Sequence, residues 1–278
     1  MPVIDAHQHF WTVAAPWHCW PGPELPSLYQ DFLPPDIAPL LDAEEVIGTV
    51  LVQSQPSSAD TDWMLDIASV QPRILGVVGW IDLVDPDAPA RIAALARRAK
   101  LKGLRPMLQD LPADWVEQPA AAPALTAIAE HGLVLDALIR PAHLRSIEAI
   151  ARRYPALSIV VDHIAKPDIA GDVRQPWASD LSCLAALPQV SCKLSGLVTE
   201  AATCCEARDL QFYVETAVSL FGPDRLLWGS DWPVVLLRTS YADWLDTART
   251  LLPPQDRHAI LYENAIRIYG LELPPRPA

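Results

Sequence analysis

Apolar, β-branched runs alternate with segments of helical periodicity along the whole chain. Eight of these runs are predicted to be strands, at residues 3–9, 48–54, 74–83, 103–108, 133–139, 158–163, 190–195 and 226–231. Several are almost continuously apolar, which is typical of parallel strands covered on both faces. Strand–helix alternation repeated eight times predicts an α/β fold, a single (β/α)8 barrel of the TIM type.

The segments between the strands carry apolar residues at helical spacing. Helices are predicted at 88–100, 144–154, 206–221, 241–252 and 256–269, and the last is expected to pack on the barrel and end at Gly270. No internal repeat or shift in composition marks a second domain, so residues 1–278 are predicted to form one domain. The Pro-rich end, LELPPRPA, is expected to be ordered only in part.

Two stretches are predicted to be long loops. Residues 11–35 follow the first strand and contain many prolines together with Trp11, Trp17, Trp20 and Tyr29. Because a loop of this length in a compact domain usually has a function, we interpret it as a lid or pocket wall over the barrel mouth. The alternative is a surface loop held by its prolines. Residues 110–123, after the fourth strand, form the second loop.

Composition and charge restrict the classes of partner. The net charge of −13 over 278 residues argues against nucleic acid and anionic membrane surfaces, which require a basic footprint. The first residues show no secretory signal, and no apolar run has the length of a membrane-spanning helix. Five cysteines without C-x-x-C spacing predict free thiols in a reducing compartment, the cytoplasm. The adjacent Cys204 and Cys205 are interpreted as a helix-start coincidence rather than a metal site.

Residues with chemical capability gather at the C-terminal ends of the predicted strands, where parallel barrels have their active sites. His7 and His9 end the first strand, and i, i+2 spacing directs both side chains into the barrel. Two such imidazoles suit one divalent metal, zinc before others, or a polarised carbonyl oxygen. Asp5, one layer deeper, is interpreted as structural. Taken alone, the pair would favour the alternative of two hydrogen-bonded polar histidines without a function.

His163 ends the sixth predicted strand and Asp231 ends the eighth. A carboxylate at the barrel mouth can take a proton from water, especially beside a cation, so Asp231 is predicted to be a general base. The alternatives are a buried core histidine for His163 and a helix N-cap before Pro233 for Asp231. The functional interpretation depends on the joint placement of these residues with His7 and His9.

Five further polar residues lie at or just beyond other strand ends. Arg105 would bind a carboxylate or a carbonyl oxygen, and its alternative is a salt bridge within the barrel. Gln53, Asp136, Lys166 and Glu200 are candidates for hydrogen bonds to substrate hydroxyls.

The residues at the end of the fourth predicted strand indicate how many metal ions the site can hold. No lysine ends this strand. The lysine nearest to it, Lys102, stands at its beginning, on the opposite side of the barrel from the predicted site. A carbamylated lysine bridging two metals is therefore not expected, and the site is predicted to hold one metal or none.

These residues resemble the amidohydrolase superfamily, in particular its amidohydrolase family 2 branch and the sugar lactonases of the L-fuconolactonase and L-rhamnonolactonase type. The matching segments are IDAHQHFW, LYQDFLPPDIAPLL, KGLRPMLQD, VVDHIAKPDI, CKLSGLVTEA, LLWGSDWPV and ENAIRIYGL, which span nearly the whole chain in order. The resemblance implies that His7, His9, His163 and Asp231 form the metal or substrate site. It also implies lactone hydrolysis in carbohydrate catabolism, with or without a metal, since metal use varies across the branch.

The residues and the resemblance together lead to a hypothesis for the reaction. The carbonyl of a small sugar lactone is polarised by one divalent metal on His7 and His9, or by the imidazoles directly. Asp231 deprotonates the attacking water and returns the proton to the leaving alkoxide, while His163 and Arg105 stabilise the oxyanion.

Two tryptophans are expected to complete the substrate site. Trp11 and Trp232 would stack on the apolar face of the sugar ring.

Three alternatives remain at this level. A metal-dependent decarboxylase of an aromatic or heteroaromatic acid ranks lower, because Asp136 and Glu200 suit hydroxyls better than a carboxylate. A lactonase for a dicarboxylate pyrone-type lactone would need several arginines at the mouth, where only Arg105 is placed. A non-catalytic binding protein on the same barrel would not require the full polar set, and the fold alone does not decide against it.

Overall fold

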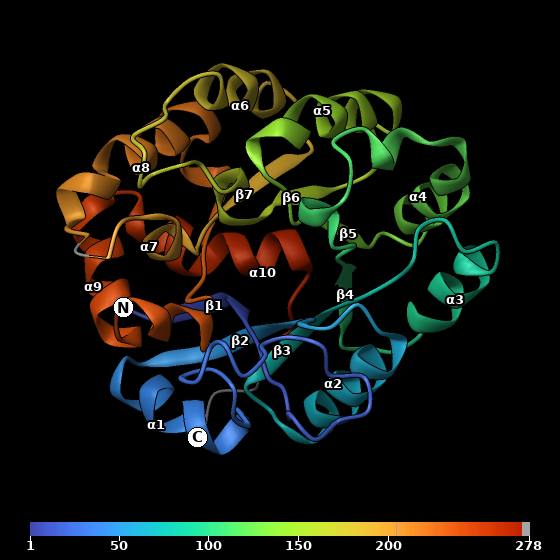
Figure 1. Cartoon of the computed structure of the whole chain (residues 1–278), viewed down its shortest axis with the longest axis horizontal. Coiled ribbons are helices and arrows are strands. Elements are labelled where there is room, and N and C mark those ends of the chain that lie inside the picture. Colours follow the sequence, from blue (N-terminus) through green and yellow to red (C-terminus); the bar gives the residue numbers. More distant parts are fainter. Residues whose placement is uncertain (204, 274–278) are drawn as a thin grey trace.

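Eight parallel strands, arranged in sequence order, form a barrel in the computed structural model, which describes residues 1–203 and 205–273 (Figure 1). The strands are β1 (Val3–Gln8), β2 (Val46–Val52), β3 (Ile74–Gly79), β4 (Leu101–Leu104), β5 (Val134–Ala137), β6 (Ile159–Val161), β7 (Val190–Leu194) and β8 (Leu226–Trp228). The barrel closes between β8 and β1, where Asp231 N donates to His7 O at 2.8 Å and His9 N donates to Trp232 O at 2.7 Å. The predicted (β/α)8 fold is therefore confirmed.

Helices surround the strands as in other barrels of this class. They are α1 (Pro34–Ala43), α2 (Ser58–Val70), α3 (Ala88–Leu95), α4 (Ala122–Glu130), α5 (Leu144–Arg153), α6 (Trp177–Ala185), α7 (Leu197–Glu200), α8 (Ala207–Phe221), α9 (Tyr241–Leu251) and α10 (Asn264–Tyr269). The predicted helix 256–269 is instead a π-helical turn, Ala259–Glu263, followed by α10. Its predicted end is correct, because Gly270 takes the left-handed φ of 55° that closes a helix.

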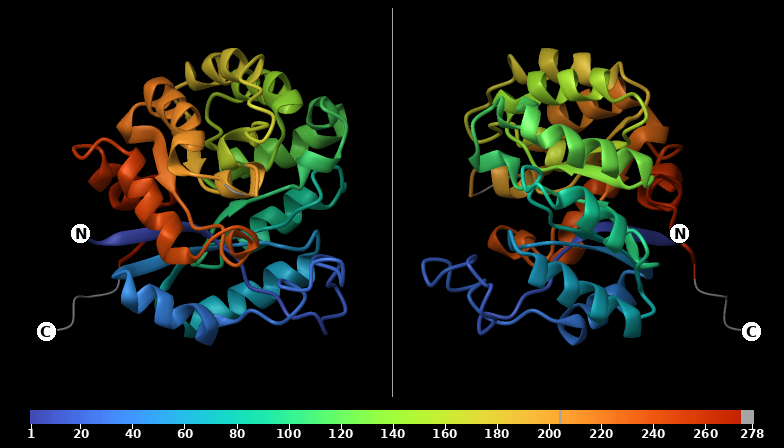
Figure 2. Two further views of the ribbon diagram at one scale, coloured as in Figure 1. Left: turned by 60° about the vertical axis from the view of Figure 1, so that its left-hand side comes forward. Right: turned by 90° about the vertical axis from the view of Figure 1, so that its right-hand side faces the viewer.

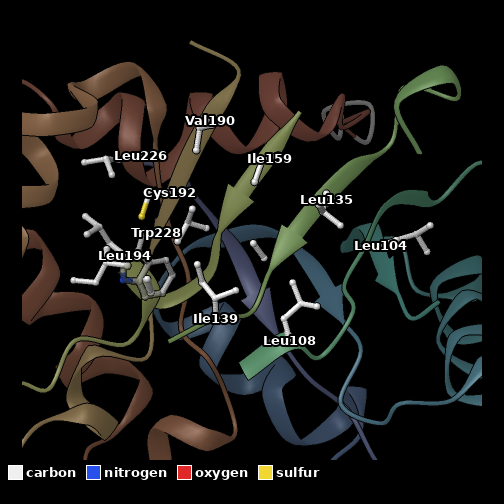
Figure 3. Packing of buried hydrophobic residues seen from close by; sticks show 14 of the residues in the cluster. Leu104, Leu108, Leu135, Ile139, Ile159, Val190, Cys192, Leu194, Leu226 and Trp228 are labelled. Atoms are coloured by element: carbon white, nitrogen blue, oxygen red, sulfur yellow. The ribbon is translucent and has the colours of Figure 1, made fainter. Parts of the chain in front are cut away.

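Alternate strand residues separate two apolar layers. One face of each strand belongs to the larger apolar cluster, which the strands share with the surrounding helices. Figure 3 shows Leu135, Ile159 and Trp228 among its members. The opposite face fills the barrel interior, where Val50, Val78, Val134, Val160 and Leu227 contact one another. The near-continuous apolar runs of the sequence follow from this burial on both faces.

One end of the barrel is covered by its own C-terminal helix. Ala265 and Tyr269 of α10 pack on the interior strand residues, and α10 lies across the centre of the ring in Figure 1. Figure 2 places the N-terminus and the red C-terminal segment at one end of the molecule and the dark blue segment after β1 at the other. The C-terminal ends of the strands are thus the open end of the barrel.

The structure can be compared with the predictions of free thiols and of no membrane-spanning helix. Cys19, Cys183, Cys192 and Cys205 are free thiols, as expected. Cys204 and residues 274–278, most of the Pro-rich end, lie outside the described residues. Within the described ranges, every helix is too short or too polar to cross a membrane.

Candidate active site

His7, His9 and Asp231 come together where β8 meets β1. The Nε2 atoms of His7 and His9 lie 3.2 Å apart, and Asp231 Oδ1 lies 3.2 Å from His9 Nε2 and 3.6 Å from His7 Nε2. This contact requires Gly229 after β8, because a Cβ at that position would lie 2.5 Å from His7 Cβ. The i, i+2 spacing of the histidines therefore leads to the predicted convergence, and the glycine allows the two strands to approach.

The donor geometry fits a single divalent metal. His9 Nδ1 lies 2.8 Å from Val52 O and donates to it, so His9 Nε2 keeps a free lone pair. Ligands about 2.0–2.1 Å from a tetrahedral ion lie roughly 3.3 Å from one another, and the three distances between these donors are close to that value. His7, His9 and Asp231 therefore form a donor set that fits such an ion.

A second group of donors, His7, Asp162 and His163, also lies close enough to hold an ion. Two cations already contact Asp162: Arg105 Nη1 at 3.3 Å from Oδ2 and Lys193 Nζ at 3.0 Å from Oδ1. Because these cations neutralise the carboxylate, the first group is the better metal site.

His163 lies on a strained turn directly after β6. Four consecutive residues, His163 to Lys166, have left-handed φ angles of 53°, 44°, 62° and 49°, a conformation that costs non-glycine residues energy. His163 Nδ1 lies 2.9 Å from Ser195 Oγ, and a Cβ at Gly196 would lie 2.6 Å from the same ring nitrogen. The turn and the small residue after β7 together direct the imidazole to the barrel mouth.

Hydrogen bonds to other residues of the protein occupy most of the guanidinium group of Arg105. Its Nη1 lies 3.3 Å from His7 Nε2 and donates to Asp162 at the same distance, while Nη2 donates to the backbone oxygen and side chain of Gln53. In return, Gln53 Nε2 donates to Arg105 O at 2.9 Å. Arg105 therefore links β2 and β4 to His7, and most of its donors are already used.

A buried charge cluster beneath the histidines was not predicted from the sequence. Lys193 Nζ on β7 lies 2.5 Å from Asp136 Oδ2, 3.0 Å from Asp162 Oδ1 and 3.2 Å from His7 Nδ1. Tyr269 of α10 donates to Asp136 Oδ2 at 2.8 Å. All five side chains are fully buried or nearly so. The alternation of apolar and polar residues in β7 could have indicated an inward lysine, but not its partners.

The protonation states follow from burial and from neighbouring charges. Burial opposes ionisation of Asp231, but the nearby His163, His9 and His7 outweigh it and hold the pKa of this carboxyl well below its usual range. Burial lowers the pKa of His163 to about 4. Burial and Lys193 also lower the pKa of His7. At neutral pH the site thus contains the ionised carboxylate of Asp231 and the neutral imidazoles of His7 and His163.

A cavity of about 500 Å3 opens above these residues. Five predicted site residues line it: His9, Arg105, His163, Lys166 and Asp231. Apolar lining comes from Trp20, Pro56, Met107, Leu138 and Val234, and polar lining from Ser54, Gln109, Asp110 and Lys166. Cys19 and Trp20 belong to the segment 11–35, so this segment contributes one wall of the cavity.

Several residues predicted to contact substrate are not among those lining the cavity. Trp11 is buried, and its indole donates to Leu28 O and Gln30 O. Trp232 is buried between Phe10 and Phe32. Both tryptophans therefore pack in the core and do not line this cavity, because position near a strand end does not reveal which aromatic side chain faces outward.

The predicted polar substrate contacts divide in the same way. Asp136 is fully buried against Lys193, and Gln53 is buried against Arg105, so both support the site from behind. Glu200 pairs with Lys166 at 3.4 Å, and of the two only Lys166 is a lining residue. The lining residues Trp20 and Asp110 come from the two predicted loops, and Gln109 directly precedes the second loop. None of the three was predicted to contact substrate.

Comparison with known proteins places this arrangement among related enzymes. The family model described as amidohydrolase matches residues 4–271. An L-fucono-1,5-lactonase of Burkholderia ambifaria is 46% identical, with 98% of this chain and 96% of that protein aligned. An L-fucono-1,5-lactonase of Burkholderia multivorans is 36% identical over 99% of this chain and 97% of its own length. A crystal structure of a B. multivorans amidohydrolase with bound zinc has a TM-score of 0.91 and 34% identity, covering 98% of this chain and 100% of that one.

Proposed function

The chain belongs to the amidohydrolase family, and from this we propose that it is a lactonase that hydrolyses sugar lactones of the L-fucono-1,5-lactone type. The observation that carries the proposal is the ionised Asp231 beside His9 and His163 at one cavity. The two L-fucono-1,5-lactonases that align over nearly the full chain support the substrate class. The reaction is ester hydrolysis in carbohydrate catabolism.

Asp231 acts as the general base. Its carboxylate takes one proton from a water molecule while the water oxygen attacks the lactone carbonyl carbon. When the ring C–O bond breaks, protonated Asp231 returns this proton to the leaving alkoxide. The product is an open-chain hydroxy acid, and the carboxylate of Asp231 is restored.

His163 is the principal donor to the oxyanion in this proposal. If Ser195 Oγ donates to His163 Nδ1, the proton of the neutral ring is on Nε2 and can be donated into the cavity. Arg105 adds positive charge near the carbonyl, but its hydrogen bonds to Gln53 and Asp162 favour a second task, the positioning of His7.

We propose that His7, His9 and Asp231 bind zinc, because two imidazole nitrogens among three ligands favour this ion. The zinc-bound B. multivorans structure supports this choice. Such an ion, when bound, would polarise the carbonyl oxygen and increase the acidity of the attacking water.

Substrate recognition in this proposal uses the rim of the cavity. Ser54, Gln109, Asp110 and Lys166 offer hydrogen bonds to sugar hydroxyls, and the segment 11–35 acts as a wall or lid. The free thiols of the described cysteines support action in a reducing compartment, the cytoplasm.

The charges at the cavity favour a neutral sugar lactone over a dicarboxylate lactone or an aromatic acid. Among the residues that line it, the basic ones with a fixed charge are Arg105 and Lys166. Arg105 is engaged by Asp162 and Lys166 by Glu200. A substrate carboxylate would therefore find little uncompensated positive charge.

A pH-indicator assay with freshly prepared sugar 1,5- and 1,4-lactones tests the proposal, since each turnover releases an acid. We expect rapid hydrolysis of L-fucono-1,5-lactone and of lactones with matching hydroxyl configuration. If no sugar lactone in the panel is hydrolysed faster than in buffer, the proposal is wrong, and aromatic lactones and metal-dependent decarboxylation become the activities to test.

A further inference from the structure

The segment 11–35 is closed on itself at its base. Trp11 N donates to Phe32 O at 3.1 Å, and Phe32 N donates to Trp11 O at 3.0 Å. The indole of Trp11 donates to Leu28 O and Gln30 O, and Val13 N donates to Asp31 Oδ1. The segment therefore behaves as a compact loop whose two ends meet beside the barrel.

The side chain of Gln55 attaches the main chain of residues 19 and 20, at the tip of this loop, to the barrel. The buried Gln55, just after β2, accepts hydrogen bonds at Oε1 from Cys19 N at 2.8 Å and from Trp20 N at 3.3 Å. Its Nε2 donates to Trp20 O at 2.6 Å and to Ser54 Oγ at 3.0 Å. A second attachment is the side-chain hydrogen bond of Trp17 with Asp60 of α2. In the described residues, the backbone hydrogen bonds of residues 12–31 other than those to Gln55 stay within the segment 11–35.

Trp20 is the aromatic residue that this attachment brings to the cavity. It is half-buried and lines the same cavity as His9, His163 and Asp231. Behind it, the ring of the buried Trp11 makes an edge-on contact with ring centroids 5.7 Å apart. A rigid, supported indole at a sugar site can bind the apolar face of a pyranose ring.

We propose that Trp20 provides the aromatic surface for the lactone ring and that Gln55 is the positioning residue that holds it there. This inference rests on the proposed lactonase function for the identity of the ligand. Gln55 acts through the main chain of residues 19 and 20, so its amide can be lost without removing any group that contacts substrate.

The kinetic test compares Gln55→Leu and Trp20→Ala with a control, Gln30→Ala. Gln30 is exposed, and its side chain donates only within the same loop, to Ser27 O at 3.1 Å. For the first two variants we expect KM for L-fucono-1,5-lactone to rise about tenfold or more with kcat within about threefold of wild type, as for lost uniform binding. Trp20→Phe should recover most of the loss, and Gln30→Ala should match wild type.

The physical test does not depend on activity. The Cys19 and Trp20 amides donate directly to Gln55 Oε1, so Gln55→Leu should speed their hydrogen exchange about tenfold or more while leaving the β-strands unchanged. Gln55→Glu keeps the acceptor but loses the donor to Trp20 O, so intermediate exchange and intermediate KM are expected.

The outcomes separate the two proposals. Wild-type exchange at Cys19 and Trp20 in Gln55→Leu would overturn the role of Gln55. Faster exchange with an unchanged KM in both Gln55→Leu and Trp20→Ala would overturn the role of Trp20 in ring binding. A wild-type protein inactive on every sugar lactone would refute the lactonase and, with it, the lactone at Trp20, while the exchange result still decides the role of Gln55.

Discussion

Asp231 is the residue on which the proposed chemistry depends most. It is buried, has a left-handed φ of 59° and is surrounded by histidines that keep it ionised. We expect Asp231→Asn to lower kcat by roughly 10²- to 10⁴-fold, the usual contribution of a general base. Asparagine tolerates the same φ, so the unfolding temperature should stay near that of wild type. An Asn variant with nearly normal kcat would remove Asp231 from this role.

His9 allows a direct test of the metal site. Loss of its Nε2 removes one of three proposed ligands, so metal affinity should fall by more than the roughly 10- to 100-fold that follows loss of a supporting residue. Competition with a chromophoric chelator measures this affinity for His9→Ala. The control is His18→Ala, because His18 contacts Pro21 O within the loop and lies outside the cluster. Equal metal retention by the two variants would contradict the proposed ligand set.

The candidate catalytic residues could be predicted from the sequence because each ends a recognisable strand. His7, His9, His163 and Asp231 all follow apolar runs, and parallel strands bring such ends to one side of a sheet. The choice of substrate contacts could not be predicted in the same way. Trp11 and Trp20 lie in one loop, and only the folding of this loop determines which of the two is buried.

The depth at which a side chain lies inside the barrel could also not be predicted from the apolar pattern of the sequence. Asp136 has the position of a strand-end residue in β5, yet it lies against Lys193 and Tyr269 beneath the histidines. How far a residue lies below the mouth depends on the stagger between neighbouring strands, which no single strand reveals.

At the level of elements, the junction of β8 with β1 determines the geometry of the site. Gly229 permits the backbone approach that places His7 beside Asp231, and a Cβ there would also lie 3.0 Å from His7 N. We expect Gly229→Ala to destabilise the fold by about 1–3 kcal/mol, as for other overpacked cores, and to reduce kcat strongly by displacing His7. Unfolding curves and kinetics on the same samples measure both effects.

Gly132→Ala is the matched control for this junction. Unlike Gly229, Gly132 has a positive φ, 64°, and nothing lies within 4 Å of its added Cβ. A strain of about 1–2 kcal/mol is expected there, with unchanged kcat. If Gly229→Ala kept full activity as well, the close approach would not be needed for catalysis.

The charge cluster around Lys193 is the second feature that links elements, since it joins β5, β6, β7 and α10. Lys193→Met would leave two buried carboxylates, Asp136 and Asp162, without their shared cation, and should cost about 3–5 kcal/mol of stability in urea unfolding. Lys166→Met removes a half-exposed pair with Glu200 and should cost less than about 1 kcal/mol. Similar losses in the two variants would contradict a structural role for the buried cluster.

Strand boundaries show what the apolar pattern can and cannot predict about elements. The eight strands were all predicted, but β3 ends at Gly79 rather than at 83, and β8 ends at Trp228 rather than at 231. Residues beyond these ends remain buried, for example Ile81 and Leu83, because they belong to the main hydrophobic core. Apolar character therefore marks burial, and it extends past the last paired residue of the strand.

At the scale of the whole molecule, the two ends of the barrel have different tasks. α10 covers one end with apolar residues and Tyr269, which stabilises the fold and supports the charge cluster. The other end carries the histidines, Asp231 and the segment 11–35. Changes at the open end should therefore alter the substrate that is accepted while the fold is retained, as is general for this architecture.

Asp60, near the open end of the barrel, is expected to make the stability of the whole fold depend on pH. This buried residue of α2 accepts hydrogen bonds at Oδ2 from Ser54 N and Gln55 N, both at 3.3 Å, just behind the attachment of the loop. Burial raises its pKa to about 6 in the folded chain, compared with about 3.9 for an unfolded aspartate. Between these pH values the folded protein holds a proton that the unfolded chain releases. The stability that Asp60 contributes is therefore complete below about pH 4 and is lost as the pH rises through 6.

Asp60→Asn cannot titrate, and its amide oxygen can still accept from the two backbone groups. The free energy of unfolding of this variant should therefore increase relative to wild type between pH 4 and 7, by roughly 2–3 kcal/mol in total, and the difference should stay constant above pH 7. Urea unfolding at half-unit pH steps measures it. Asp62→Asn, on the exposed side of the same helix, controls for the change in net charge and should show no such rise. A difference between Asp60→Asn and wild type that does not vary with pH would mean that Asp60 is ionised in the folded protein throughout this range.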